Sequence, residues 1–255
     1  ALSLLGHKIT VINNCKNEFI VDNTHWKNIN LYSKKDTFDI TFSNGDCRLF
    51  DLVNSKKKIL FSHSLQSIEK FIRKKQLLAF FKHRPIVAYL GKYHLKHRSR
   101  LLNLFGILKV EYAVDKIFLN AIIDDNIDNN LAIFTSRPDR NLSELSNIWI
   151  NKIYPKNKNL KLSITESSVK NEYNIINRKF SSQNDLVNSL LKSRVFLIPG
   201  HKAELFCLAA EEAKELCIPI VTLGKGCLSE RVEHEKTGFI ARNADEFANF
   251  TIELF

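Results

Sequence analysis

Residues 195–241 read VFLIPGHKAELFCLAAEEAKELCIPIVTLGKGCLSERVEHEKTGFIA, and this stretch decides the fold. Val195 to Ile198 is a short apolar run stopped by a Pro-Gly pair, which is typical of a buried parallel strand ending at a loop. In Phe206 to Leu216 the apolar residues recur at helical spacing. A second apolar run, Ile218 to Leu223, follows. The stretch therefore predicts a strand, a helix and a second strand, which together form a βαβ unit.

Two glutamates flank the predicted helix. Ligands of open α/β sheets bind outside the carboxyl ends of the strands, where loops 199–205 and 224–230 meet this helix. Glu204 lies just before the helix, and Glu212 lies two turns into it, at the edge of the apolar stripe. Free N–H groups at the helix start favour phosphate, and the two carboxylates are spaced to accept hydrogen bonds from hydroxyl groups, so the pattern suits a nucleotide sugar. Alternatively, Glu204 only complements the helix dipole and Glu212 is a solvated surface residue.

The same stretch carries a family resemblance. The run ELFCLAAEEA, Glu204 to Ala213, resembles the E-x7-E motif of the retaining GT-B glycosyltransferases of family 4. Ile218 to Val221 is similar to that family's G-x-P-V-V, Gly226 to Glu230 to its G-G-x-x-E loop, and Thr237 to Phe239 to its T-G-x-L/V. Several motifs in order are more specific than one glutamate pair. The resemblance implies an α/β fold of the GT-B type, in which two Rossmann-like domains face a cleft, and we expect the first domain to lack its first strand.

The family also implies a reaction and a site. A glycosyl group passes from a nucleoside diphosphate sugar to an acceptor hydroxyl with retention of configuration, and neither a metal nor another cofactor is needed. By resemblance, Glu212 binds the ribose hydroxyls and Glu204 the donor sugar. The other residues that the resemblance assigns to donor binding are Phe206, Cys207, Leu208, Gly226 and Glu230.

Two arginines follow the strand predicted at Leu131 to Thr135. Arg137 and Arg140 lie in the sequence SRPDR, and guanidinium groups suit phosphate because their planar forks make paired, charge-assisted hydrogen bonds. In the family the corresponding strand ends in G-R followed by another cation, so the resemblance implies that both arginines hold the diphosphate and neutralise its charge as it departs. Surface ion pairs are the alternative for both residues.

The acceptor side rests on one histidine. The family often places a His of the first domain near the donor sugar, and His63, at the end of a strand predicted over Lys58 to Ser62, is our candidate for that catalytic position. Asn44 and His94 are alternatives. A strand-end histidine bonded to backbone is the other interpretation of His63.

Charge and boundaries divide the chain. Residues 1–119 contain 21 Lys and Arg against 9 Asp and Glu, whereas residues 120–255 contain 17 against 18. The polar run DDNIDNN predicts domains at 1–122 and 123–255, and Lys116 to Asp124 predicts a linker strand. Further short strands are expected at Lys8 to Asn13, Phe19 to Val21, Ile29 to Leu31, Phe38 to Phe42 and Ile86 to Leu90.

The basic half suggests a surface as a partner. Ser67 to Lys82 predicts one basic amphipathic helix, and Tyr93 to Arg100 adds more cations, so residues 67–100 suit an anionic membrane surface. The alternative is a helix that packs on the core with a basic solvated face. Nucleic acid is disfavoured because the aromatic residues are not interleaved as stacking platforms. The sequence has no apolar run long enough to span a bilayer, no signal-peptide pattern and no paired cysteine spacing, so we expect a cytoplasmic protein with reduced thiols.

Two cysteines depart from the family pattern. Cys207 replaces the Gly of E-P-F-G, and Cys217 replaces the Gly that ends the helix. A left-handed conformation at Cys217 would cost about 1 kcal/mol, because a side chain with a Cβ is strained there. Besides a transferase, the sequence leaves open a non-catalytic nucleotide-sugar-binding or membrane-surface scaffold with a GT-B-like fold, and another GT-B enzyme such as a sugar epimerase.

Overall fold

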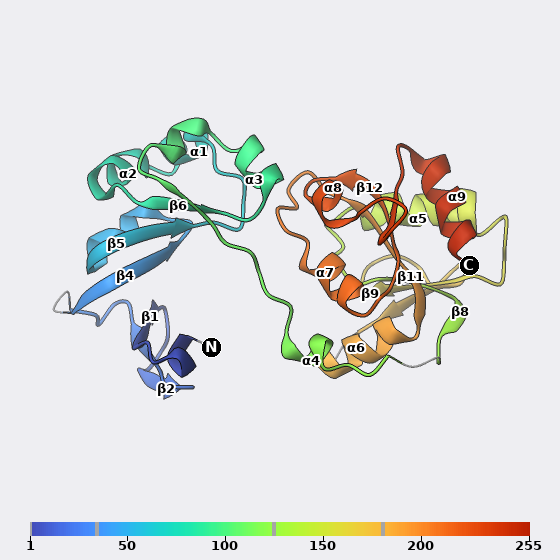
Figure 1. Ribbon diagram of the computed structural model, residues 1–255, viewed down its shortest axis with the longest axis horizontal. Helices are drawn as coiled ribbons and strands as arrows, with labels where there is room; N and C mark the ends of the chain where they lie inside the picture. The colour runs from blue at the N-terminus through green and yellow to red at the C-terminus, as the bar shows by residue number, and fades with distance from the viewer. Residues whose placement is uncertain (1, 34–35, 124–125, 180–181) are drawn as a thin grey trace.

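The computed structural model describes residues 2–33, 36–123, 126–179 and 182–255, which form two α/β units joined by an extended segment (Figure 1). The C-terminal unit is built on a six-stranded, all-parallel sheet with the order β10-β9-β8-β11-β12-β13. Its strands are β8 (Asp128–Phe134), β9 (Lys161–Thr165), β10 (Ile175–Arg178), β11 (Ser193–Gly200), β12 (Ile220–Lys225) and β13 (Gly238–Ile240). In chain order this is the doubly wound arrangement 3-2-1-4-5-6, so the chain reverses direction across the sheet between β8 and β11.

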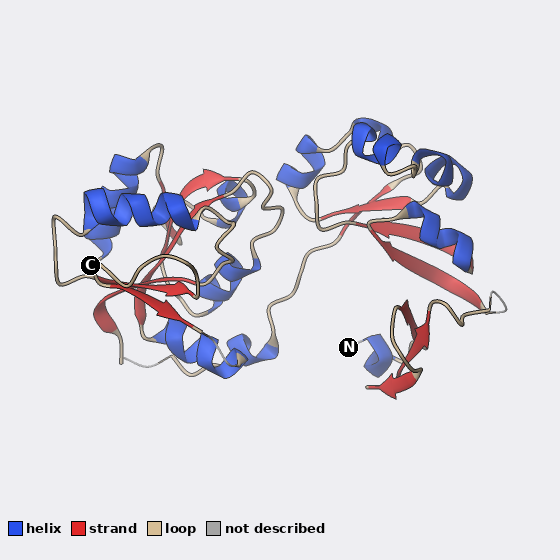
Figure 2. Ribbon diagram, turned by 180° about the vertical axis from the view of Figure 1, so that it is seen from behind, coloured by secondary structure: helices blue, strands red, loops and turns tan. Residues whose placement is uncertain are grey.

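Helices cover both faces of this sheet (Figures 1 and 2). One face carries α5 (Leu142–Ile148), the π-helical turn η4 (Trp149–Ile153) and α9 (Ala244–Leu254), and the other carries α6 (Gln183–Leu191) and α7 (Leu208–Glu215). The short helix α8 (Leu228–Arg231) follows β12. Apolar side chains from both layers bury Phe134, Trp149 and Phe196 completely. This burial explains the apolar runs of the central strands, residues 131–134 in β8 and 195–198 in β11.

The N-terminal unit contains a four-stranded parallel sheet, β4-β5-β6-β7, with α1, α2 and α3 on one face (Figure 1). The strands are β4 (Thr37–Asn44), β5 (Asn54–Phe61), β6 (Ile86–Tyr89) and β7 (Ile107–Lys109). The helices are α1 (Ile68–Arg73), α2 (Leu77–His83) and α3 (Lys92–His97), with 3-10 turns η2 (Cys47–Leu52) and η3 (Arg100–Asn103). Phe50, Phe71 and Phe80 are the large side chains of its core.

A separate three-stranded sheet precedes these elements. It contains β1 (Ile9–Asn13), β2 (Phe19–Val21) and β3 (Thr24–Asn28) after the 3-10 turn η1 (Leu2–Leu5), and β3 pairs parallel with β1 and antiparallel with β2. In Figure 1 it lies apart from the four-stranded sheet. The strand predicted at Ile29 to Leu31 is wrong, because the observed strand, β3, lies just before it at Thr24–Asn28. The strand ends at Asn28, whose side chain donates to Cys15 O at 2.7 Å and accepts from the Asn30 N–H at 2.8 Å, turning the chain.

The single helix predicted over 67–82 is also wrong. The chain leaves α1 with Lys75 in the left-handed region at φ 54°, and the N–H groups of Lys75 and Gln76 donate back to Ile72 and Phe71. The side chain of Gln76 is buried, where it donates to Gly45 O at 3.2 Å and accepts from the Cys47 N–H at 3.3 Å. These long-range bonds explain a break that helical periodicity does not reveal.

The linker likewise differs from the predicted strand over Lys116 to Asp124. Lys116–Leu119 forms helix α4, capped by the Asp115 carboxylate, which accepts from the Ile117 N–H at 3.0 Å. Phe118 is buried in the C-terminal core and holds this turn in place. Asp124 and Asp125, at the predicted domain boundary, lie outside the described residues.

Cys217 ends α7 in the strained conformation that its replacement of Gly predicts. Its φ is 58°, its N–H donates to Lys214 O at 2.9 Å, and the Ile218 N–H donates to Ala213 O at 2.9 Å. These two bonds define a Schellman motif, in which a residue without a Cβ is favoured at the position of Cys217.

We predict that Cys217→Gly raises the free energy of unfolding in urea by about 1 kcal/mol, because it relieves the left-handed strain at an exposed position. Cys217→Ala is the matched control, since it also removes the thiol but keeps the Cβ. Equal stability of the two variants would contradict the explanation.

Candidate functional site

The loops after β8 and β11 meet where the six-stranded sheet changes direction, and each carries a predicted site residue. Arg140 follows β8 and Glu204 follows β11. Arg140 Nε lies 3.1 Å from Glu204 Oε2, and the two side chains are only 21% and 17% exposed. Asn141 Nδ2 donates to Gly200 O at 2.5 Å and ties the same loops together. The sequence therefore brings a half-buried cation and a carboxylate into contact at the edge where doubly wound sheets bind ligands.

Burial dominates the electrostatics of Glu204. Its pKa is raised because burial of the carboxylate outweighs the opposing effects of Arg140, Arg137 and His201 and of a hydrogen bond from the Cys207 N–H. Arg137 lies further out, 69% exposed and 3.2 Å from Asp139. Of the two predicted arginines, only Arg140 forms an ion pair with Glu204.

Glu212 on α7 has a half-buried carboxylate. Burial raises its pKa, and within residues 2–33, 36–123, 126–179 and 182–255 no hydrogen bond or ion pair reaches its side chain. Its neighbour Glu211 differs, because it pairs with Lys214 at 2.8 Å and with Arg231 at 3.4 Å. Glu212 is thus a half-buried acceptor whose lone pairs are free for a ligand.

The loop that precedes α7 is tightly packed. Cys207 is buried in the left-handed region, at φ 58°, and α7 begins at Leu208. The facing loop approaches so closely that a Cβ on Gly226 would lie 2.3 Å from His201 O and 2.8 Å from Glu204 O. Only glycine fits at Gly226, and this close fit fixes the backbone of Glu204.

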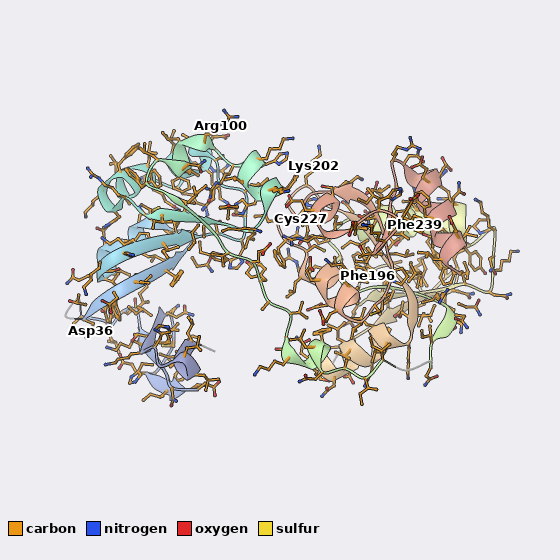
Figure 3. All side chains as sticks on the ribbon, in the orientation of Figure 1. Asp36, Arg100, Phe196, Lys202, Cys227 and Phe239 are labelled. Carbon is orange, nitrogen blue, oxygen red and sulfur yellow. The ribbon has the colours of Figure 1, made fainter. Side chains whose placement is uncertain are left out.

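Glu230 lies at the contact between the two units. Its carboxylate accepts from the backbone N–H of Lys92, at 2.8 Å, and from that of Tyr93, which are the first residues of α3. The Tyr93 hydroxyl donates to Lys202 O at 2.7 Å, and Figure 3 shows Lys202 at the edge that faces the N-terminal unit. The predicted donor-binding Glu230 therefore caps a helix of the opposite unit.

An aromatic cluster brings His63 to the same contact. His63 stacks on Tyr112 with ring centroids 5.8 Å apart and shares a hydrogen bond between its Nδ1 and the Tyr112 hydroxyl. Tyr112 packs edge-on against Phe206 at 5.0 Å, and the Arg231 guanidinium lies 4.0 Å from the centroid of that ring. The Phe206 side chain is thus part of an interdomain contact.

The alternatives to His63 occupy other places. His94 is fully buried, its Nδ1 accepts from the Leu90 N–H at 3.3 Å, and burial lowers its pKa to about 4. Asn44 is exposed at the end of β4. Our sequence reasoning missed Tyr112 and Arg231. The position of Arg231 directly after the G-x-x-x-E segment was the one sequence feature that pointed to its place in the site. No motif marks Tyr112.

A cavity of about 410 Å³ opens between the units. Its lining residues are Lys92, Tyr93, Lys96 and His97 from the N-terminal unit and Gly224, Gly226, Ser229 and Glu230 from the C-terminal unit. Among the residues that the structure describes, no group of three or more His, Cys, Asp or Glu is arranged to hold a metal ion. The helices of the same described segments include none that is both long and apolar enough to cross a membrane.

Comparison with known proteins matches part of the chain to a family. Residues 149–254 match the family model described as Glycosyl transferases group 1 and therefore form a domain of that kind. No curated protein matches the sequence. The family model begins at η4 and ends at the last residue of α9, so it includes Glu204, Glu212 and Glu230.

Several solved structures share the fold. A mutant of TarM from S. aureus, in complex with fondaparinux, alpha-GlcNAc-glycerol and UDP, is 18% identical with a TM-score of 0.62, covering 79% of this chain and 44% of that one. AviGT4, a glycosyltransferase involved in avilamycin A biosynthesis, is 13% identical with a TM-score of 0.61, and the match covers 98% of this chain and 77% of that one. HepE from Anabaena, in complex with UDP and glucose, is 14% identical with a TM-score of 0.56, and the match covers 76% of this chain and 60% of that one.

The predicted GT-B class of α/β fold is confirmed by these structures. The chain spans about half the length of the TarM structures that it matches, 44% in one and 50% in another.

We predict that Glu212→Gln stabilises the free protein at neutral pH but not in acid. Below the ordinary pKa of 4.5 the carboxyl group is protonated in both the folded and the unfolded state. Because the folded-state pKa is raised, the wild type loses stability as pH rises through that pKa, and the Gln variant does not. Urea unfolding at about pH 4 and about pH 8 tests this linkage. A wild-type-to-variant difference that is the same at both pH values would contradict it, and exposed Glu215→Gln is the control on the same helix.

Proposed function

We propose that this chain is part of a glycosyltransferase that binds a nucleoside diphosphate sugar and transfers the sugar to an acceptor hydroxyl with retention of configuration. One observation carries the proposal: the ion pair of Arg140 and Glu204 lies at the switch point of the sheet, and the carboxylate of Glu212 on the adjoining helix α7 has no hydrogen-bond or ion-pair partner among the residues that the structure describes. UDP in the TarM and HepE structures supports a nucleotide donor.

Each residue has a role that fits its surroundings. Glu212 accepts hydrogen bonds from the ribose hydroxyls, which satisfy a half-buried carboxylate that has no hydrogen bond or ion pair within the described segments. Glu204 accepts from a hydroxyl of the donor sugar, and Arg140 stays beside it, facing the diphosphate. The backbone of Phe206, Cys207 and Leu208 and the loop containing Gly226 and Glu230 complete the donor site.

The chemistry is electrostatic. Departure of the nucleoside diphosphate builds negative charge on its oxygens, and Arg140 and Arg137 stabilise that charge from fixed positions without a metal. Arg140 is held by Glu204, so it needs little reorganisation when the charge develops. His63 lies on the acceptor side, where its contact with Tyr112 fixes the ring. We assign it the catalytic position nearest the donor sugar.

We predict that Glu212→Gln weakens UDP binding about tenfold or more, because hydrogen bonds from hydroxyls to a charged group each contribute about 1.5–3 kcal/mol. Isothermal titration calorimetry with UDP measures this. Glu215→Gln, an exposed residue of the same helix, should bind UDP as the wild type does.

Titration of the wild type with UDP-, GDP- and ADP-sugars, followed by assays of turnover, separates the alternatives. Absence of binding to all of them would refute the proposal. Binding without hydrolysis or transfer would favour a non-catalytic scaffold, and conversion of the donor to its epimer would favour an epimerase. A transferred sugar with inverted configuration would refute retention.

For the acceptor we propose a saccharide of a cell-surface polysaccharide or a lipid-linked saccharide, met in the cytoplasm at the inner membrane surface. The structure offers a specific observation for this location. In residues 67–100, Ile72 and Leu78 are 58% and 86% exposed, and Lys74, Lys75 and Lys82 lie beside them in the sequence. Exposed apolar side chains with flanking cations suit the interface of an anionic bilayer.

We predict that the wild type floats with vesicles containing phosphatidylglycerol and that salt weakens the binding, since the cations act through screened charge. The double variant Ile72→Ser/Leu78→Ser should lose most of this binding. The control Leu4→Ser/Ile122→Ser removes two apolar side chains elsewhere that are 81% and 84% exposed, and it should retain the binding. Flotation that is independent of anionic lipid would end the membrane assignment.

A further inference from the structure

A second cavity, of about 610 Å³, lies wholly within the N-terminal unit. It is formed by the carboxyl ends of β4 and β5, the following loops and helix α1. Its charged lining residues are the cations Arg48, Lys70, Arg73, Lys74 and Lys75 and the acid Asp46. Such a volume is typical of sites for small ligands.

Asp46, whose pKa is also affected by the nearby charge of Lys74, is the single carboxylate in the described lining of this cavity, against five cations. Asp46 is engaged by Arg48, with Oδ2 2.6 Å from Nη2. In the described segments, no carboxylate forms an ion pair with the other four cations. Lys70 is held inward by hydrogen bonds to Ser64 Oγ and to Leu65 O at 3.5 Å. Burial lowers its pKa, and the nearby charges of Lys74 and Arg73 lower it further, as expected where like charges are crowded.

A buried side chain in the same lining also lacks partners. Gln66 is only 2% exposed, and neither Nε2 nor Oε1 has a hydrogen-bond partner anywhere in the described structure. Buried polar atoms are almost always satisfied, so an unpaired amide that lines a cavity is suited to hydrogen-bond a ligand there. The amide N–H groups can donate to an anion, and the amide oxygen can accept from a sugar hydroxyl.

His63 connects this cavity to the proposed site of transfer. It lines the cavity, and its ring also contacts Tyr112, which packs against Phe206 of the C-terminal unit. A ligand in the cavity therefore lies on the acceptor side, next to the histidine assigned to the reaction.

We propose that this cavity binds a phosphate-bearing acceptor, with the phosphate held by Lys70 and Lys74 and an adjoining sugar hydroxyl directed toward His63. The proposal rests on the proposed function, and it adds the chemical class of the acceptor. Unpaired ammonium and guanidinium groups favour a phosphate ester over an uncharged saccharide. Asn44, Ser62, Ser64 and Gln66 supply the polar lining that a saccharide requires.

The test compares two labelled oligosaccharides that differ only in one phosphate monoester, the second being made from the first with a phosphatase. Fluorescence anisotropy should give about tenfold tighter binding for the phosphorylated form. Lys70→Gln/Lys74→Gln should remove this preference. Lys57→Gln/Arg100→Gln changes the net charge equally at exposed positions that do not line the cavity and should retain it; Figure 3 shows Arg100 pointing into solvent.

Equal binding of the two oligosaccharides by the wild type would overturn the proposal, as would equal losses in the two double variants. Flotation on phosphatidylglycerol vesicles that depends on Lys70 and Lys74, together with no preference for the phosphorylated oligosaccharide, would overturn it in favour of a membrane contact. UDP titrations of the same proteins separate this proposal from the donor site. If the wild type binds UDP but shows no preference for the phosphorylated oligosaccharide, only the cavity proposal is refuted. If the wild type does not bind UDP, the donor-site proposal is refuted.

Discussion

Burial of β11 on both faces is the constraint on which the rest of the site depends. Val195 to Gly200 are all buried, and the strand pairs in parallel with β8 and β12. Because a parallel strand must be covered on both faces, the chain has to leave it at the carboxyl edge and return through helix α7. Gly200 makes this exit at φ 88°, where a Cβ would lie 2.7 Å from Lys225 O. The path that results delivers Glu204 to the crevice beside β8.

Local sequence patterns predicted the helices and strands that bury apolar side chains. They failed where contacts with residues distant in the sequence determine the path of the chain. The apolar runs of β8, β11 and β12 were visible because residues 132–134, 195–200 and 220–222 of these strands are buried. The break in the helix at Lys75 was not visible in the sequence, because it depends on hydrogen bonds between the Gln76 side chain and the backbone of Gly45 and Cys47. The same holds for the site: spacing and resemblance pointed to Glu204, Glu212 and Arg140, whereas Tyr112 enters only through the packing of two units.

The two cysteines that replace glycines show how a site tolerates strain. Cys207 and Cys217 both have φ 58°, so the chain retains the left-handed turns at both ends of α7 although each carries a Cβ. The surrounding packing holds such conformations in place, as is common at binding sites. Burial raises the pKa of the Cys207 thiol well above its ordinary value, so the side chain remains neutral. A neutral thiol adds no negative charge where the proposal places a diphosphate.

The two units use charge differently, and this difference follows from which carboxylates are present. Around α7 every functional cation has a carboxylate near it, Arg140 with Glu204 and Arg231 with Glu211, so phosphate alone gains little there. Under the proposed function, a ligand that also presents hydroxyl groups to Glu212 gains more, which would favour a nucleotide sugar over a simple anion. In the described part of the chain, Lys70 and Lys74 of the N-terminal cavity form no ion pair with a carboxylate, and the one acid in the lining, Asp46, is paired with Arg48, so the excess of positive charge favours an anion. Cations are present at both the donor site and the N-terminal cavity. Under the proposed function, the two places therefore distinguish donor from acceptor by their carboxylates, which pair with the cations at the donor site.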